Sequence, residues 1–88
     1  MFSNYHKSEM NNKIKYKNVF IKCFNVNEQD VENLVYNGIS AWDSVGHINL
    51  IDELETSFEI MIEPDDILDF VSYKKGMKIL NEKYNVEF

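Results

Sequence analysis

The chain has 88 residues, of which 44% are hydrophobic and 27% charged, and its formal net charge at pH 7 is −6. These values predict one small globular domain with a modest core, and no apolar run suggests a membrane span or a signal peptide, so we expect a soluble, cytoplasmic protein. The one cysteine, Cys23, excludes an internal disulfide and a cysteine-based metal site, and its apolar neighbours predict a buried, unreactive thiol.

The charge is distributed unevenly along the chain. Residues 1–27 carry a balance of +4, residues 28–71 carry −12 without a single lysine or arginine, and residues 72–88 carry +2. Because binding of a phosphate backbone needs basic side chains, the acidic middle argues against nucleic acid as a partner. It would instead attract basic protein surfaces. A need for solubility would explain the sign of this charge but not its concentration in one segment.

The first half of the chain predicts one helix and a long connection. Residues 1–9 have no clear period and are expected to form a loose leader or a fraying first turn, so that a single domain covers residues 10–88. A helix is predicted from about Met10 to Phe24, ending at Asn25. Residues 25–43 should pack their own apolar side chains, with a helical turn near 30–35 and with Trp42 as a partly buried lid. The inward face of the predicted helix consists of Tyr16, Val19, Phe20, Cys23 and Phe24.

The second half predicts two longer helices with a short one between them. The first runs from Ser44 to about Glu59, and the short helix begins at Pro64, where a missing N–H costs nothing, and ends near Asp69. Ser72 is expected to cap the last helix, residues 73–84, which Gly76 should weaken. The side chains expected to place the short helix on the core are Ile67, Leu68 and Phe70. The prediction is therefore an all-α fold, a bundle of three main helices plus one short helix.

The helix predicted from Ser44 has two different faces. One face carries the apolar residues Leu50, Ile51, Leu54 and Phe58 at helical spacing, which indicates the core side. The other face carries two aliphatic residues framed by carboxylates, which suggests a docking surface, although other parts of the chain could also cover the two aliphatics. The residues of this candidate surface are Val45, Ile48, Asp52, Glu55 and Glu59.

Ser44 is the candidate for chemistry in this region. A serine at a helix N-terminus lies near positive dipole, which suits the attachment of a phosphate group, while a simple capping role is the alternative. His47 follows one turn later, but the chain has no glycine-flanked nucleophile elbow and no evident oxyanion hole, so we do not expect an enzyme. Neither the two histidines nor the spacing of the carboxylates predicts a metal site.

The block Asp43-Ser44-Val45 resembles the attachment motif of acyl and peptidyl carrier proteins, and the resemblance covers about residues 12–84. It is supported by the apolar spacing that follows, by Pro64 and the segment 65–68, by the acidity and by the long first connection. The chain departs from the family pattern in two places. Val45 stands where the motif has leucine, and Ala41-Trp42 stand where fatty-acid carriers usually have glycine and a small residue. The string from Trp42 to His47 is similar to stand-alone carriers of specialised pathways.

The resemblance implies a function and a set of partners. A phosphopantetheinyl transferase, using coenzyme A and Mg²⁺, would attach 4′-phosphopantetheine to Ser44, and the arm would hold acyl or aminoacyl groups as thioesters. Asp43, together with the five residues of the candidate docking surface, would contact the transferase, a loading ligase and acyltransferases or synthases with basic surfaces. A monomer is expected. A different function also remains open at this point, that of an unmodified acidic helical adaptor for a basic protein.

Overall fold

The computed structural model describes the backbone of residues 3–88 and the side chains of residues 12–88. The helices in this part of the chain are α1 (Ser3–Phe24), the 3₁₀ turn η1 (Val31–Asn33), α2 (Ser44–Phe58), α3 (Pro64–Asp69) and α4 (Tyr73–Tyr84). The described residues contain no strand, only an isolated antiparallel bridge between Val35 and Ser72. The predicted all-α fold of three main helices and one short helix is confirmed, and η1 is the helical turn expected in the first connection.

Three of the helix boundaries follow from local signals in the sequence. Asn25, directly after α1, has the left-handed φ of 53° expected of a helix stop. Pro64 occupies the first turn of α3, with Asp65 and Asp66 beside the positive end of the helix dipole. The Ser72 side chain accepts a hydrogen bond from the backbone N–H of Lys75 and so caps α4.

The start of α1 differs from the prediction. The helix begins at Ser3 rather than near Met10, so residues 3–9 are helical and do not form a loose leader; Met1 and Phe2 lie outside the described residues. No glycine or proline occurs between Ser3 and Phe24, and nothing in the backbone therefore stops the helix from extending towards the N-terminus. The absence of an apolar period in this stretch did not exclude a helix.

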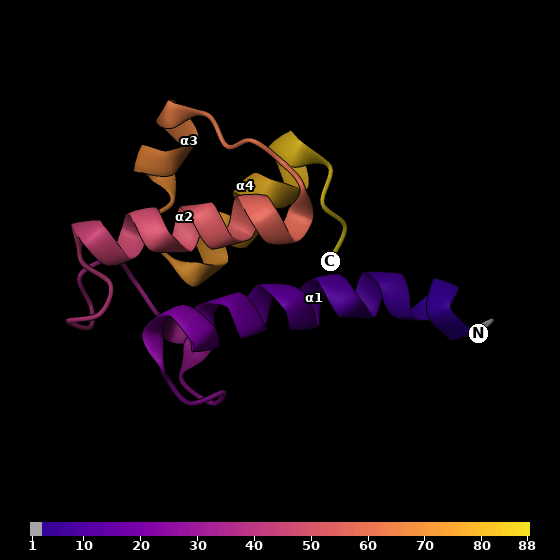
Figure 1. The fold of residues 1–88 in the computed structure, drawn as a ribbon, viewed down its shortest axis with the longest axis horizontal. Helices are drawn as coiled ribbons and strands as arrows, with labels where there is room; N and C mark the ends of the chain where they lie inside the picture. Colours follow the sequence, from indigo (N-terminus) through magenta and orange to yellow (C-terminus); the bar gives the residue numbers. More distant parts are fainter. Residues whose placement is uncertain (1–2) are drawn as a thin grey trace.

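The helices surround one apolar core (Figure 1). In the view of Figure 1, α1 lies below α2, α3 lies above it, and α4 passes behind it. Aromatic side chains dominate the centre. The centroid of the Phe20 ring lies 4.8 Å from that of the Tyr73 ring and 5.5 Å from that of the Trp42 ring. The fully buried side chains include Tyr16, Phe20, Val31, Trp42, Leu50, Leu54, Phe70 and Leu80.

Two expected core residues are placed differently. Leu68 is 77% exposed, so the prediction that it places α3 on the core is wrong. The inward side of this six-residue helix is occupied by Asp66, Ile67 and the following Phe70, and Leu68 therefore points away. Cys23 is only partly buried, and this burial, with Glu53 nearby, raises the pKa of its thiol, which disfavours the reactive thiolate as expected.

Asp66 is buried because α4 supplies partners for both of its oxygens. Its Oδ1 accepts a hydrogen bond from Lys83 Nζ at 2.7 Å, and its Oδ2 accepts one from the Tyr84 hydroxyl at 2.6 Å. The Tyr84 oxygen in turn accepts a hydrogen bond from the backbone N–H of Glu63. These contacts join the start of α3 to the end of α4.

Candidate functional site

The start of α2 is capped by Asp43 and not by Ser44. Asp43 has extended backbone angles, and its Oδ1 accepts a hydrogen bond from the backbone N–H of Gly46 at 2.8 Å. Ser44 is the first residue of the helix proper, and its side chain is exposed. Because the carboxylate of Asp43 satisfies the cap, the Ser44 hydroxyl is not needed for it. The sequence had left a capping role for Ser44 open.

Trp42 and His47 hold in place the turn that carries Ser44, residues 42–47, which we call the corner. The expectation that Trp42 is a partly buried lid is wrong, because its side chain is fully buried. Its ring stacks on that of Phe24, with 5.2 Å between the ring centroids. Its indole N–H donates a hydrogen bond to His47 Nδ1 at 2.9 Å. Because Nδ1 accepts, the ring proton belongs on Nε2, which lies 2.8 Å from the carbonyl oxygen of Ile67 in α3.

The same hydrogen bonds determine what His47 can do. Both of its ring nitrogens are engaged, one by the loop before α2 and the other by α3. A general base for Ser44 would need a free ring nitrogen within hydrogen-bond reach of the hydroxyl. The one-turn spacing of Ser44 and His47 therefore follows from the contacts that His47 makes with Trp42 and with α3. It does not indicate a nucleophile and its base.

Gly46 is required by close packing. A Cβ at this position would overlap the carbonyl oxygen of Ala41 and would lie 3.3 Å from the Phe24 ring. The loop can thus pass directly over the first turn of α2 only when residue 46 has no side chain. Trp42, Gly46 and His47 position Ser44, and none of them was assigned a site role from the sequence. The sequence signal for this packing is the Trp42–His47 string, which places an aromatic residue, a glycine and a histidine within six residues.

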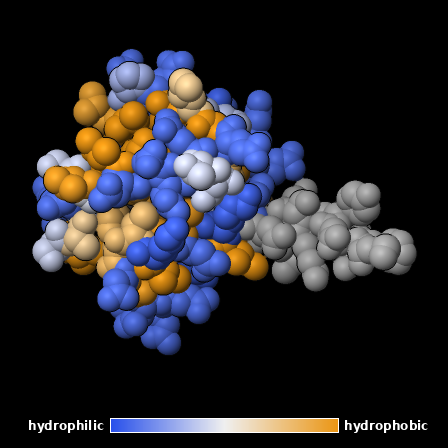
Figure 2. Space-filling view, viewed as in Figure 1, coloured by the Kyte–Doolittle hydropathy of each residue, from blue (hydrophilic) through white to orange (hydrophobic). Residues whose placement is uncertain are grey.

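The two aliphatic residues of the candidate docking surface are uncovered. Val45 and Ile48 are each 67% exposed, so no other described part of the chain covers them. Leu68 on α3 adds a further exposed aliphatic on the element that His47 joins to this corner. Figure 2 shows hydrophobic residues at the surface around the start of α2 and on α3, interleaved with hydrophilic ones. An apolar patch with a charged rim is a common feature of docking surfaces.

The three carboxylates of this surface do not have the same role. Asp52 is exposed on α2, and Glu59 is exposed just after it. Glu55 is partly buried, and its Oε2 accepts a hydrogen bond from the backbone N–H of Ile62 at 2.8 Å. Glu55 thus anchors the segment between α2 and α3, a structural role that the sequence did not reveal. Glu59 closes α2 in the left-handed conformation, with a φ of 55°.

Two further properties bear on possible partners. Among the described residues, no group of three or more histidine, cysteine, aspartate or glutamate side chains is placed to hold a metal ion. No helix in the described part of the chain has the length and apolar character needed to cross a membrane.

Comparison with known proteins gives no relative. The chain matches no protein-family model, no curated protein and no solved structure.

Proposed function

We propose that this protein is a stand-alone carrier that holds acyl or aminoacyl groups on a 4′-phosphopantetheine arm attached to Ser44. The observation that carries the proposal is the state of Ser44: an exposed serine on the first turn of a 15-residue helix whose cap is provided by its neighbour Asp43. The hydroxyl can therefore be modified without loss of the cap. The backbone N–H groups of the first turn offer positive dipole to a phosphate at this position.

The attachment step is a phosphoryl transfer from coenzyme A. The bond from Ser44 Oγ to phosphorus forms, the pyrophosphate bond of coenzyme A breaks, and adenosine 3′,5′-bisphosphate leaves. The base that takes the hydroxyl proton and the Mg²⁺ come from the transferase. The arm then supplies a terminal thiol for thioester chemistry. The proposal places this reaction in the cytoplasm, where coenzyme A is available.

This chain's own task is presentation of the arm to other enzymes. The corner is held by the Trp42–His47 contact and by the hydrogen bond to α3, so the attachment point has a fixed orientation. Val45 and Ile48 offer apolar contact beside it, and Asp52 and Glu59 add negative charge that attracts a basic surface. We propose as partners a phosphopantetheinyl transferase, a loading ligase and acyltransferases or synthases of a specialised pathway.

Intact mass spectrometry tests the attachment. The purified chain, incubated with coenzyme A, Mg²⁺ and a promiscuous phosphopantetheinyl transferase, should gain the mass of one phosphopantetheine group, and Ser44→Ala should gain none. Ser40→Ala, at an exposed serine four residues earlier, is the matched control and should be modified like the unaltered chain. An unmodified wild-type chain, or a Ser44→Ala variant that still gains the group, would contradict the proposal.

The exposure of Val45 and Ile48 also supports a second candidate function, an unmodified acidic adaptor for a basic protein. In that case Ile48→Asp should abolish function in the native cell while Ser44→Ala leaves it intact. A carrier should lose function with either change. Met61→Asp is the control, because Met61 is 83% exposed but lies outside α2 and α3.

A further inference from the structure

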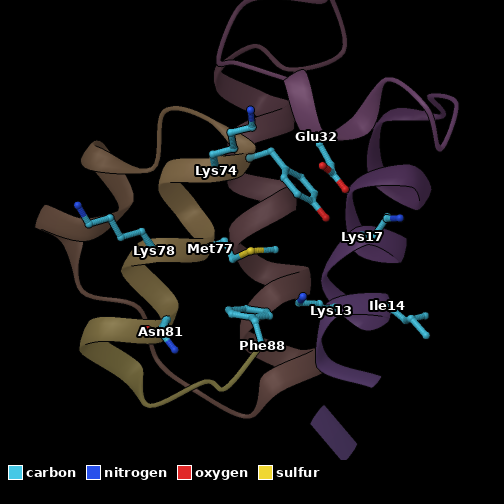
Figure 3. Close-up of a pocket in the computed structure, with 10 residues that line it drawn as sticks. Lys13, Ile14, Lys17, Glu32, Lys74, Met77, Lys78, Asn81 and Phe88 are labelled. Atoms are coloured by element: carbon cyan, nitrogen blue, oxygen red, sulfur yellow. The ribbon is translucent and has the colours of Figure 1, made fainter. Parts of the chain in front are cut away.

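A second candidate binding surface lies between α1 and α4. A groove of about 880 Å³ runs between these helices, and none of its lining residues belongs to α2 or α3. Figure 3 shows α4 on one side and α1 on the other, with Met77 and Phe88 between them. This groove takes no part in the site around Ser44.

The charge of the groove is opposite to that of the whole chain. Lys13 and Lys17 line it from α1, and Lys74 and Lys78 line it from α4, while Glu32 is the one acidic side chain among the lining residues. The lining residues thus carry a surplus of positive charge in a chain of net charge −6. Lys17 has an ion pair with Glu28 at 3.5 Å, and the described residues provide no ion pair for the two lysines of α4.

The floor of the groove is apolar. Tyr73 is buried beneath it, Met77 and Phe88 are partly buried, and Ile14 on the α1 side is 50% exposed. Lysines above an apolar floor favour a ligand that has an apolar face and negative charges on its flanks. A small inorganic anion would leave the floor uncovered, and a purely apolar ligand would leave the lysines without partners.

The dimensions favour a helix as the occupant. On α4 the lining residues extend from Tyr73 to Asn81, just over two helical turns or about 12 Å at the usual rise per residue. The groove lies between two helices, which is the arrangement in which an amphipathic helix buries its apolar face. The negative charge of the whole chain opposes approach to a nucleic acid or an anionic bilayer, both of which are large polyanions.

We propose that the groove between α1 and α4 docks an acidic amphipathic helix of a partner protein, two to three turns long. Its apolar side chains would cover Met77 and Phe88, and its carboxylates would pair with Lys13, Lys74 and Lys78. The chain would then contact partners through two surfaces of opposite charge. Basic surfaces would approach the start of α2, and an acidic helix would enter the groove. This inference does not depend on the modification of Ser44.

A designed peptide tests the groove directly. The probe is a fluorescein-labelled three-turn peptide with leucines at positions i, i+4 and i+7 and glutamates on both flanks, titrated with the full chain by fluorescence anisotropy. It should bind, and raised ionic strength should weaken the binding. A scrambled peptide of the same composition and a version with lysine in place of glutamate should not bind.

Charge reversals on α4 locate the binding site. Lys74→Glu or Lys78→Glu should weaken binding about fivefold, the effect of losing one surface ion pair. Lys75→Glu is the matched control: it makes the same change on an exposed neighbour in α4 that does not line the groove, and it should leave the affinity unaltered. All three variants change surface side chains, so each should remain folded.

Four results would overturn the proposal. They are the absence of peptide binding, equal binding of the scrambled peptide, equal loss of affinity in Lys74→Glu and Lys75→Glu, and occupation of the groove by a second copy of this chain. The last would appear as concentration-dependent NMR shifts of α1 and α4 without peptide. Failure here leaves the mass test of Ser44 unaffected, so the two proposals can fail separately.

Discussion

At position 76 in α4, the structure has no room for a methyl group. A Cβ on Gly76 would overlap the ring of Phe70 and lie 2.5 Å from the hydroxyl of Tyr16. Both neighbours are fully buried, and the Tyr16 hydroxyl donates a hydrogen bond to the carbonyl oxygen of Tyr73. Neither side chain can move away without disturbing the core.

Gly76→Ala should therefore destabilise the protein, although helix propensity alone would make it stabilising by about 1 kcal/mol. Overpacking of this kind costs about 1–3 kcal/mol, and the overlap with two fully buried rings favours the upper part of this range. After the gain in helix propensity is subtracted, we expect the free energy of unfolding to fall by up to about 2 kcal/mol. Urea denaturation followed by circular dichroism measures it. Lys75→Ala, at an exposed position of the same helix, should change the stability by less than about 0.5 kcal/mol. A stabilised Gly76→Ala variant would show that the core can adjust.

Single residues also mark the limit of prediction from sequence. The exposed positions of Ser44, Val45 and Ile48 follow from helical periodicity, because the core side of α2 was clear. The burial of Trp42 depends on Phe24 and His47, which lie on other elements, and no local pattern reports such a contact. The exposure of Leu68 likewise depends on which side of a six-residue helix faces the core.

Among the elements, α3 depends most on contacts made by others. It is six residues long and is joined to α4 through Asp66, Lys83 and Tyr84, and to α2 through His47. A helix this short is not stable alone, so these contacts determine its position. The bounds of α3 and α4 were predictable because Pro64 and Ser72 give local start signals. The extension of α1 to Ser3 was not predictable, since it has neither a clear period nor a breaker.

The contacts of Asp66 predict how stability depends on pH. The hydrogen bonds from Lys83 and then from Tyr84 lower the pKa of this carboxyl below its ordinary value of 3.8. A lowered pKa in the folded state means that the ionised form adds stability above pH 3.8, and this contribution is lost as the pH falls through the folded value. The contribution of Asp66 to the melting temperature should therefore be lost as the pH is lowered below about 4.

Asp66→Asn isolates this contribution. The variant should melt at a lower temperature than the unaltered chain at pH 7. Its melting temperature should fall less than that of the unaltered chain on acidification, because position 66 no longer titrates. Asp65→Asn removes the neighbouring carboxylate, which is exposed, and should follow the unaltered chain. Differential scanning calorimetry between pH 7 and pH 2 provides the comparison. Parallel curves for the unaltered chain and Asp66→Asn would contradict the assignment.

In the whole molecule, folding brings basic ends onto an acidic middle. The ion pairs of the described residues all join a lysine from outside residues 28–71 to a carboxylate inside that segment: Lys17–Glu28, Lys22–Glu53 and Lys83–Asp66. The segment holds twelve carboxylates, so these three pairs leave most of its negative charge without a described partner. This excess repulsion opposes the folded state.

Added salt should therefore raise the melting temperature. Screening weakens the repulsion among many carboxylates more than it weakens three pairs, and a gain of about 1 kcal/mol would raise the melting temperature by roughly 4–8 °C in a domain of this size. Thermal melts in 0 to 0.5 M NaCl, a range chosen to shorten the Debye length to about 4–5 Å, test this. The melting temperature of a triple variant at three exposed positions should rise less with added salt; the changes are Asp52→Asn, Glu63→Gln and Asp65→Asn. A flat or falling melting temperature in the unaltered chain would disprove the repulsion.

The fully buried Trp42 gives the molecule an optical signal of its own. It is the one tryptophan of the chain, it lies two residues before Ser44, and its ring contacts Phe20, Phe24 and His47. Its fluorescence emission therefore reports on this corner without any added label, since the fully buried indole has no contact with water. Emission from this one indole follows both the folding of the bundle and the local state of the turn that carries Ser44.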